Sequence, residues 1–449
     1  MAKDNYFCLV FISKPNPMKR IIEPGIMHPR DQIIAVISRI YRNGMTTTSG
    51  GNISIIDDNE DIWVTPSAID KGSLTPADII CVKKDGTITG RHKPSSEYPF
   101  HKAIYKSRPD IKAIIHAHPP ALVSFSIVRR IPDTNVISQA KHICGPIGYA
   151  PYAVPGSELL GQKIAIEFNK GFHAVIMENH GAVVGGADLV DAYQRFETLE
   201  FCGRSILYGN MIGNVHYLKD SDIEQFEAQI PHLLPEQESV SYPSDEREKR
   251  AEICRIVHRA LDQGMMISSY GTVSTRWKGN DFLITPTNVP RWNLTPSDII
   301  QIKDGKREPG KIPSRSVFLH QEIYARFPKI NSIILTQPPY LMSFGIARKN
   351  FDVRTIPESW IFLQDVPRLP FGSHFKGEQA VIDSISSGMP ALIIENDSFI
   401  VTGDGLLQTF DRLEVAEFSA KSLVMASSMG ELVPINDEQV EDLRKAFLS

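Results

Sequence analysis

Apolar and polar positions follow two different periods along this chain, and the same succession of periods occurs twice. In residues 31–43 and again in 252–263, apolar residues recur every three or four positions and a glycine follows, which predicts an amphipathic helix in each place. A longer helical pattern covers 189–207. Short runs rich in β-forming residues predict strands at 61–65, 79–83, 113–118 and 174–178. The mixture predicts an α/β fold in which helices cover a central sheet.

An internal repeat accounts for this recurrence. TPSAIDKGSLTPADII at 65–80 returns 220 positions later as TPTNVPRWNLTPSDII. IIHAHPPALVSF at 114–125 returns after 219 positions as IILTQPPYLMSF, and MENHGAVVGG at 177–186 returns after 217 positions as IENDSFIVTG. Because similarity at a nearly fixed offset marks a duplicated unit, the chain predicts two tandem copies of one domain of about 200 residues.

The repeat divides the 449 residues into four predicted segments. Residues 1–28 form an N-terminal extension, and 29–218 form the first copy. Residues 219–246 are acidic and contain proline, which predicts a linker with at most one short helix. Residues 247–449 form the second copy.

Composition excludes several classes of protein. The 48 Lys and Arg residues against 52 Asp and Glu give a net charge of −4, so no basic field exists for nucleic acid or an anionic membrane. The apolar run at 7–12 is too short to span a bilayer. Five cysteines without metal or disulfide spacing fit a reducing compartment. We expect a cytoplasmic protein with neither nucleic acid nor membrane as a partner.

Three histidines carry the clearest sign of chemistry. His116 and His118 end a predicted strand, where residues two positions apart project from the same face, and His180 ends another such run. Three neutral imidazoles with an open fourth position suit a catalytic Zn²⁺ or a similar divalent ion better than a structural one. The second copy keeps the apolar frame but replaces the three histidines with Leu335, Gln337 and Asp397. The frame therefore packs without histidine, which favours a ligand role.

Glu97 follows a serine pair at the start of a predicted helix. Ser95 and Ser96 can cap that helix and also offer hydroxyl and backbone donors to an anion. Glu97 has two interpretations, a capping carboxylate or a general base beside the metal. The second copy reads Pro-Ser-Arg-Ser at 313–316, so the carboxylate is lost together with the histidines. This joint loss indicates that the four residues form one unit.

A loop rich in glycine and hydroxyl groups is the candidate phosphate site. Residues 46–54 read TTTSGGNIS and include Asn52, and such a loop can bring backbone amides close to a phosphate. Ser67, which follows Thr65-Pro66, adds another hydroxyl and amide. We expect Asn52 and Ser67 to contact an anionic group of the substrate together with the serine pair.

These motifs, in this order, resemble the class II aldolase/adducin family. The matching pieces are GGNIS at 50–54, TPS at 65–67, PSSE at 94–97 with His101, HAHP at 116–119, PY at 151–152 and NHG at 179–181. The resemblance covers the whole first copy, and the second copy resembles the same fold with its site erased. It implies a central, largely antiparallel sheet covered by helices, Zn²⁺ on the three histidines, and phosphate held by the Gly-Asn loop, the Thr-Pro-Ser turn and the serine pair.

The resemblance also implies a reaction. In family aldolases the glutamate at the place of Glu97 exchanges a proton during carbon–carbon cleavage while the metal stabilises the enediolate, and related epimerases carry aspartate there. Retro-aldol cleavage of a sugar phosphate or a related hydroxycarbonyl compound is therefore the leading hypothesis. A dehydratase, a decarboxylase, an epimerase and a non-catalytic adducin-like binding or scaffold protein are the alternatives. The general acid stays unassigned. Family fuculose phosphate aldolases use a tyrosine as the acid, and ungapped alignment places Ile137 near that position, which leaves His142, Tyr149 and Tyr152 as substitutes for the tyrosine.

Quaternary structure is the last implication of the resemblance. Family members commonly form four-fold tetramers whose sites lie between neighbouring subunits. A tandem chain then implies a homodimer that builds a pseudo-tetramer, in which the degenerate copy walls the active copy and lends it the missing acid.

Overall fold

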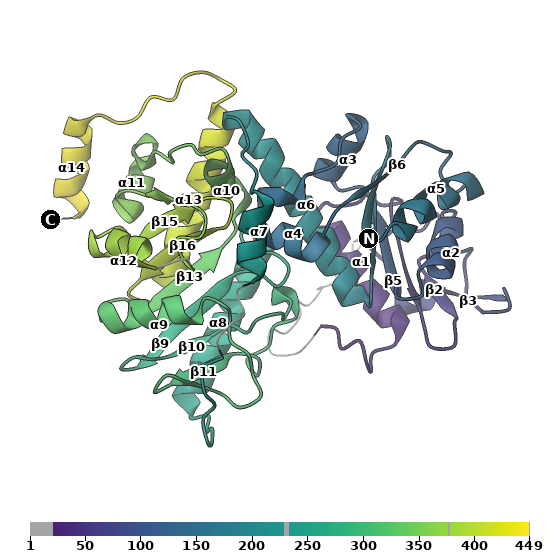
Figure 1. The fold of residues 1–449 in the computed structure, drawn as a ribbon, viewed down its shortest axis with the longest axis horizontal. Helices are drawn as coiled ribbons and strands as arrows, with labels where there is room; N and C mark the ends of the chain where they lie inside the picture. The colour runs from purple at the N-terminus through teal and green to yellow at the C-terminus, as the bar shows by residue number, and fades with distance from the viewer. Residues whose placement is uncertain (1–20, 229–232, 376–377, 449) are drawn as a thin grey trace, which may run out of the picture.

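The structure is a computed structural model that describes residues 21–228, 233–375 and 378–448. The apolar run at 7–12 lies outside the described residues. The chain forms two lobes, one for each copy, and α4, α6 and α7 lie where the lobes meet (Figure 1). Within the described ranges, no helix combines the length and apolarity needed to cross a membrane.

The first copy contains an eight-stranded sheet in the order β4-β3-β2-β1-β5-β8-β7-β6. Every neighbouring pair is antiparallel except β6 and β7. The strands are β1 Asn52–Ile56, β2 Ile62–Val64, β3 Ile80–Val82, β4 Ile88–Thr89, β5 Ala113–Ala117, β6 Gly148–Ala150, β7 Ala174–Met177 and β8 Ala182–Gly186. The helices are α1 Pro29–Arg42, α2 Tyr98–Ser107, α3 Pro120–Ile127, α4 Ser138–Cys144, α5 Glu158–Asn169, α6 Leu189–Ile212 and α7 Asp220–Glu227, with 3-10 turns at Pro76–Asp78 and Thr134–Val136.

The second copy repeats this sheet in the order β12-β11-β10-β9-β13-β16-β15-β14, with β14 and β15 parallel. Its strands are β9 Thr272–Lys278, β10 Asp281–Ile284, β11 Ile300–Lys303, β12 Lys306–Arg307, β13 Ser332–Thr336, β14 Arg368–Leu369, β15 Ala391–Ile394 and β16 Ser398–Gly403. Its helices are α8 Ser244–Asp262, α9 Val317–Arg326, α10 Pro339–Ile346, α11 Pro357–Leu363, α12 Gln379–Ser386, α13 Leu406–Ala426 and α14 Asp437–Phe447, with 3-10 turns at Arg291–Asn293 and Val353–Thr355. The predicted fold, two tandem copies of a largely antiparallel sheet covered by helices, is confirmed.

The sequence pattern explains why each sheet is buried on both faces. Helix α1 begins with a proline in its first turn and buries one apolar stripe that includes Ile33 and Ile37. This stripe packs with α6 on one face of the sheet, while α2 and α5 share an apolar cluster with the other face. The central strand β5 is buried along its whole length, which explains its continuous apolar run.

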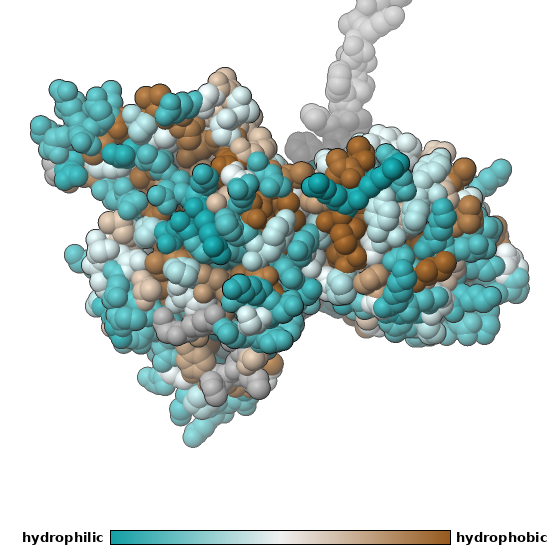
Figure 2. All heavy atoms as spheres, turned by 45° about the horizontal axis from the view of Figure 1, so that its top comes forward, coloured by the Kyte–Doolittle hydropathy of each residue, from teal (hydrophilic) through white to brown (hydrophobic). Residues whose placement is uncertain are grey.

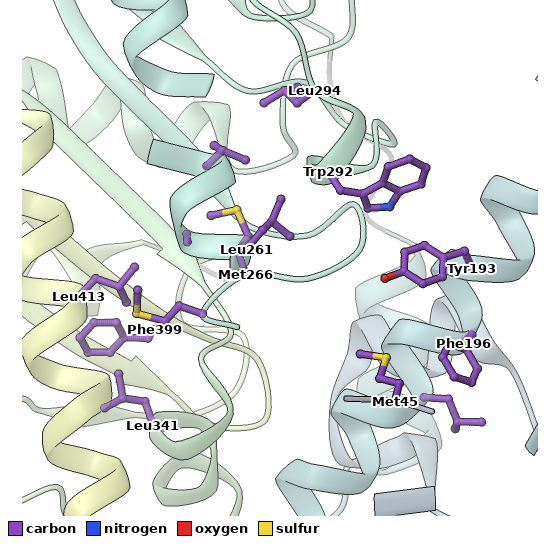
Figure 3. Close-up of a cluster of buried hydrophobic side chains, with 14 of the residues drawn as sticks. Met45, Tyr193, Phe196, Leu261, Met266, Trp292, Leu294, Leu341, Phe399 and Leu413 are labelled. Atoms are coloured by element: carbon purple, nitrogen blue, oxygen red, sulfur yellow. The ribbon is translucent and has the colours of Figure 1, made fainter. Parts of the chain in front are cut away.

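One apolar cluster continues from the first copy into the second. Tyr193 on α6 faces Trp292 of the second copy, with ring centroids 5.7 Å apart (Figure 3). The guanidinium of Arg39 lies over both rings. Further along α6, the ring of Tyr208 stacks on Tyr340 at 4.2 Å. The copies therefore share a packed core across their interface.

The predicted linker at 219–246 contains helix α7 and the first residues of α8. Helix α7 buries Ile223 and Phe226. The ring of Phe226 receives the guanidinium of Arg315 from the second copy at 4.4 Å. Helix α7 therefore contacts the second copy.

Candidate active site

Three histidines from two separate segments meet beside the sheet of the first copy. His116 lies in β5, His118 follows the last residue of β5, and His180 lies in the turn between β7 and β8. Their ring centroids are 4.7 to 5.1 Å apart, and one nitrogen of each ring lies within 4.8 Å of the other two. The structure thus brings together the three predicted metal ligands.

A tight turn places His180 against the end of β5. Asn179 takes a left-handed conformation with φ 53°, and the amide of His180 donates to the carbonyl of Met177. A Cβ atom at Gly181 would lie 2.6 Å from the carbonyl oxygen of Ala117. Only glycine allows this close approach between the two segments, which keeps His180 beside His118.

The donor set fits a divalent cation. The Nδ1 of His116 donates to the carbonyl of Ala182 at 2.9 Å, so its Nε2 carries a lone pair. That lone pair lies 3.1 Å from a carboxylate oxygen of Glu97, and two electron-rich atoms at this distance require a shared cation or proton. The buried Nε2 of His118 has no hydrogen-bond partner among the described residues. Burial, followed by the neighbouring imidazoles, lowers the pKa of His118 to about 3 and that of His180 to about 4, which keeps these rings neutral as metal ligands require.

Glu97 points at the histidines and does not cap the helix it precedes. It occupies the N-cap position of α2 without a side-chain capping bond. Its two oxygens lie 3.1 Å from His116 Nε2 and 3.4 Å from His180 Nε2. Burial acts to raise the pKa of Glu97, and the hydrogen bond from the Asn52 amide acts to lower it. Of the two interpretations, the geometry favours the carboxylate beside the metal cluster.

A series of hydrogen bonds from buried side chains holds Glu97 in place. The Nδ2 of Asn52 donates to Glu97 at 2.8 Å, so the carbonyl oxygen of Asn52 accepts from Nε2 of His101 at 2.5 Å. The Nδ1 of His101 then accepts from Ser54 at 2.7 Å, and Ser54 accepts from Tyr105 at 2.7 Å. Burial is the main cause that lowers the pKa of His101 to about 3, so the neutral ring can serve as donor and acceptor at once. Every donor in this chain is assigned.

Sequence reasoning assigned no role to Ser54, His101 or Tyr105. The alternation of β1 places Ser54 on the same face as Asn52, and the helical spacing of His101 and Tyr105 places both on one face of α2. This spacing was the available signal, but it does not show which strand lies under α2.

The predicted anion-binding residues lie around the same helix start. An isolated bridge between Pro66 and Pro94 holds the turn with Ser67 beside the serine pair. The hydroxyl of Ser95 accepts from the amide of Glu97 at 3.3 Å, while Ser96 is exposed and Ser67 is half-buried. The side chain of Asn52 is engaged by Glu97 and His101. Phosphate binding by Asn52, Ser67, Ser95 and Ser96 stays a prediction.

Among the described residues, no hydrogen bond or ion pair joins the suggested substitutes for the general acid to the histidine cluster. The Nδ1 of His142 lies 3.9 Å from a carboxylate oxygen of Glu227 on α7, toward the second copy. Tyr152 is exposed, and the OH of Tyr149 is buried. The first copy therefore presents Glu97 as the carboxylate on its cluster and leaves the general acid unassigned.

The corresponding place in the second copy is filled. Tyr270 stands where the first copy has Gly50, and its OH donates to the carbonyl of Gln139 in the first copy at 3.3 Å. A Cβ atom at Gly50 would already lie 2.8 Å from Nδ1 of His118. Asp397, which replaces His180, accepts from the amide of Gln139 at 3.0 Å. Side chains of both copies thus occupy the space that the first copy keeps open.

Comparison with known proteins matches both copies to one family. A family model described as the class II aldolase and adducin N-terminal domain matches residues 31–207 and again 251–424. The chain is 31% identical over 192 residues to 3-oxo-tetronate 4-phosphate decarboxylase of Haemophilus influenzae, covering 42% of this chain and 90% of that protein. It is 33% identical over 172 residues to L-fuculose phosphate aldolase of Methanocaldococcus jannaschii, covering 38% of this chain and 91% of that protein.

A solved structure of L-fuculose 1-phosphate aldolase is 28% identical and covers 44% of this chain and 93% of its own, with a TM-score of 0.40. The two matched regions contain the open site of the first copy and the filled site of the second. The chain therefore belongs to the class II aldolase and adducin N-terminal domain family, with two copies of the family domain in tandem.

Proposed function

We propose that the first copy is a divalent-metal-dependent lyase that cleaves a carbon–carbon bond in a sugar phosphate or a related hydroxycarbonyl compound. One observation carries this proposal: the buried carboxylate of Glu97 lies against two rings of a three-histidine cluster. A base beside an open His₃ site is the arrangement that proton transfer next to a polarised carbonyl requires. The names of the two relatives, a phosphate aldolase and a phosphate decarboxylase, support the same class of reaction.

The side chains of the first copy divide the work. His116, His118 and His180 hold Zn²⁺ or another divalent ion, which when bound supplies a Lewis acid for the negative charge beside a carbonyl. Glu97 takes the proton of the substrate hydroxyl as the carbon–carbon bond breaks and returns it to product. Its position is fixed by the Asn52 amide, so the carboxylate stays directed at the cluster.

The substrate phosphate binds at the start of α2. Ser95 and Ser96 precede this ten-residue helix, whose N-terminal amides and dipole favour an anion. The turn with Ser67 is joined to the same segment by the Pro66–Pro94 bridge. Neutral hydroxyls and amides thus hold the phosphate, in keeping with the modest charge of the chain.

Decarboxylation of a 3-oxo acid phosphate is the second candidate. It is favoured by the 31% identity to a decarboxylase over 90% of that protein. Both reactions break a bond next to a carbonyl and leave negative charge there, so the same histidines serve either one. Release of an aldehyde from a sugar phosphate identifies the aldolase, and release of CO₂ from a 3-oxo acid phosphate identifies the decarboxylase.

Metal analysis combined with both assays tests the proposal. We expect the purified chain to hold one divalent ion, and the double variant His116→Ala/His118→Ala to lose both the ion and the activity. His92→Ala is the matched control, because His92 pairs with Asp78 outside the cluster. Metal retained by the double variant would refute the site. A chain that binds no metal and cleaves neither substrate class would indicate the adducin-like binding protein instead.

A further inference from the structure

A buried lysine lies under the turn that carries Ser67. Hydrophilic side chains cover much of the visible surface of both lobes (Figure 2). Lys71 departs from this pattern, because it is 1% exposed. Burial lowers the pKa of Lys71, since an ammonium group is costly to bury unless hydrogen bonds replace its water. The hydrogen bonds of this side chain therefore need an explanation.

Two backbone carbonyls of the turn receive the ammonium group. The Nζ of Lys71 donates to the carbonyl of Pro66 at 2.9 Å and to that of Ile69 at 3.1 Å. These residues flank Ser67 and Ala68, so the ammonium group joins the two ends of the turn. Ala68 takes a left-handed conformation with φ 56°, which a residue with a Cβ atom keeps only where its surroundings hold it. Lys71 supplies such a hold from the buried side of the turn.

The backbone at the same position joins the turn to the other predicted anion-binding segments. The amide of Lys71 donates to the carbonyl of Thr48, in the loop rich in glycine and hydroxyl groups, at 2.8 Å. The amide of Ser95 donates to the carbonyl of Thr65, at the start of the turn, at 3.1 Å. A shift of the turn therefore changes its position relative to both segments.

The second copy holds its own turn with an arginine. Arg291 stands 220 positions after Lys71 and is 2% exposed. Its guanidinium donates to the carbonyls of Pro286 and Val289, which are the counterparts of the two carbonyls in the first copy. Asn288 takes the left-handed conformation there, with φ 57°. The turn thus accepts either cation, and the second copy provides a matched control without the histidine cluster.

We propose that Lys71 is a positioning residue for the substrate phosphate, because its bonds to two carbonyls keep Ser67 and the amide of Ala68 directed at that anion. Ala68 is exposed, and its amide has no hydrogen-bond acceptor among the described residues. The positive charge of Lys71 lies beneath the turn, where it is screened less than an exposed charge and attracts the phosphate. This inference rests on the proposed function, and it adds a buried cation to the neutral groups that contact the phosphate.

Titration with inorganic phosphate tests the proposal without an assay of activity. In calorimetry on the full chain, Lys71→Met should raise the Kd for phosphate about 10-fold, because it removes both hydrogen bonds and the charge. Lys71→Arg should bind phosphate like the parent chain, as the turn of the second copy accepts arginine. Arg291→Met is the matched control: it should lower stability in urea as Lys71→Met does, but leave the Kd for phosphate unchanged.

A double variant separates the hold on the turn from general packing. Glycine adopts the left-handed conformation freely, so Ala68→Gly/Lys71→Met should recover part of the lost phosphate affinity. This chain also gives the comparison where Lys71→Met alone is too unstable to titrate. The proposal would be overturned by an unchanged Kd in Lys71→Met, by an equal rise in Arg291→Met, by no recovery in the double variant, or by a parent chain that binds no phosphate.

Kinetics distinguishes a failure of this inference from a failure of the proposed function. On the phosphorylated compound that the parent chain cleaves, Lys71→Met should raise KM about 10-fold and leave kcat and metal content unchanged. A lyase whose KM and phosphate affinity are both unchanged in Lys71→Met would refute the role of Lys71 alone. A chain that shows the expected phosphate titrations but cleaves neither substrate class would refute the lyase and keep Lys71 as the residue that positions the anion-binding turn.

Discussion

The two copies share one backbone plan and differ in what lies at the end of one strand. In the first copy His116 lies in that strand and His118 follows it beside Gly50, and the rings of the three-histidine cluster are close enough to share one cation. In the second copy Tyr270 replaces the glycine, and its hydroxyl is bonded across the interface. The same backbone frame therefore holds either an open histidine cluster or side chains that bond to the other copy, depending on a few residues.

The frame itself is kept where the chemistry is lost. Ser274, His320 and Tyr324 repeat the hydrogen bonds of their counterparts in the first copy. The series of hydrogen bonds ends at His320, because Thr272 replaces Asn52 and bonds to Ser314 instead. The buried Nε2 of His320 therefore has no hydrogen-bond partner among the described residues. The buried Ser-His-Tyr group therefore stabilises the packing of both copies, and it supports a carboxylate only in the first copy.

The largest effect is expected when Gly50 of the first copy is replaced by tyrosine, the residue at the equivalent position of the second copy. Gly50→Tyr places a ring against His118, where even a Cβ atom would lie at 2.8 Å, so metal binding and lyase activity should both be abolished. Gly25→Tyr is the control, since no heavy atom lies within 4 Å of the Cβ position there. Metal content and activity are measured on both variants. Normal metal content in Gly50→Tyr would show that this glycine does not keep the site open.

The next largest effect concerns the carboxylate. Glu97→Gln removes the base but keeps the shape, so kcat should fall about 10²-fold to 10⁴-fold while the metal is retained. Ser316→Glu puts a carboxylate at the equivalent place in the second copy and should add no activity, because the histidines are absent there. An unchanged kcat in Glu97→Gln would remove Glu97 from the mechanism.

A smaller effect is expected when the buried histidine under each copy is replaced, and it distinguishes a role in supporting Glu97 from a role in packing. His101→Ala breaks the chain behind Asn52, so activity should fall about 10-fold with the metal still bound. His320→Ala removes the matching ring in the second copy and should leave kcat unchanged. Each variant should lose about 1–3 kcal/mol of unfolding free energy through its buried hydrogen bonds, measured in urea. Equal loss of kcat in both variants would contradict the separation.

The smallest effect is a pH dependence of the free energy of unfolding, to which both copies contribute. Glu200 and Glu417 accept hydrogen bonds from the first amides of α3 and α10, and burial raises their pKa values to about 7 and about 8 from the ordinary value of 4.5. Between about pH 4.5 and pH 8 these two carboxyls hold more protons in the folded chain than in the unfolded chain. The free energy of unfolding therefore falls as the pH rises through this range.

Glu417→Gln should remove part of that fall, on the order of 2 kcal/mol, in urea titrations at pH 5 and pH 8. Glu248→Gln, on an exposed part of α8, is the control. A fall that is the same in the parent chain and in Glu417→Gln would show that Glu417 is ionised in the folded chain.

Local pattern was enough to predict much of the fold. The helical periods at 31–43 and 189–207 correspond to α1 and α6, and the apolar run ending in His116 corresponds to β5, because burial follows directly from which positions are apolar. The predicted linker contains the short helix α7, and local pattern could not show that its Phe226 contacts both His142 of the first copy and Arg315 of the second. The hydrogen-bond chain behind Glu97 was not assigned because it joins a strand and a helix some 45 residues apart.

The duplication, the three histidines of the first copy and their replacement in the second can all be read from the sequence alone, since the two copies align at a nearly fixed offset. The tertiary structure was needed to show that Glu97 turns to the histidines and away from the helix amides, and that Gln139 bonds to Asp397 of the second copy. The physical reason is that side-chain direction and the pairing of surfaces depend on packing between distant segments, which no local period records.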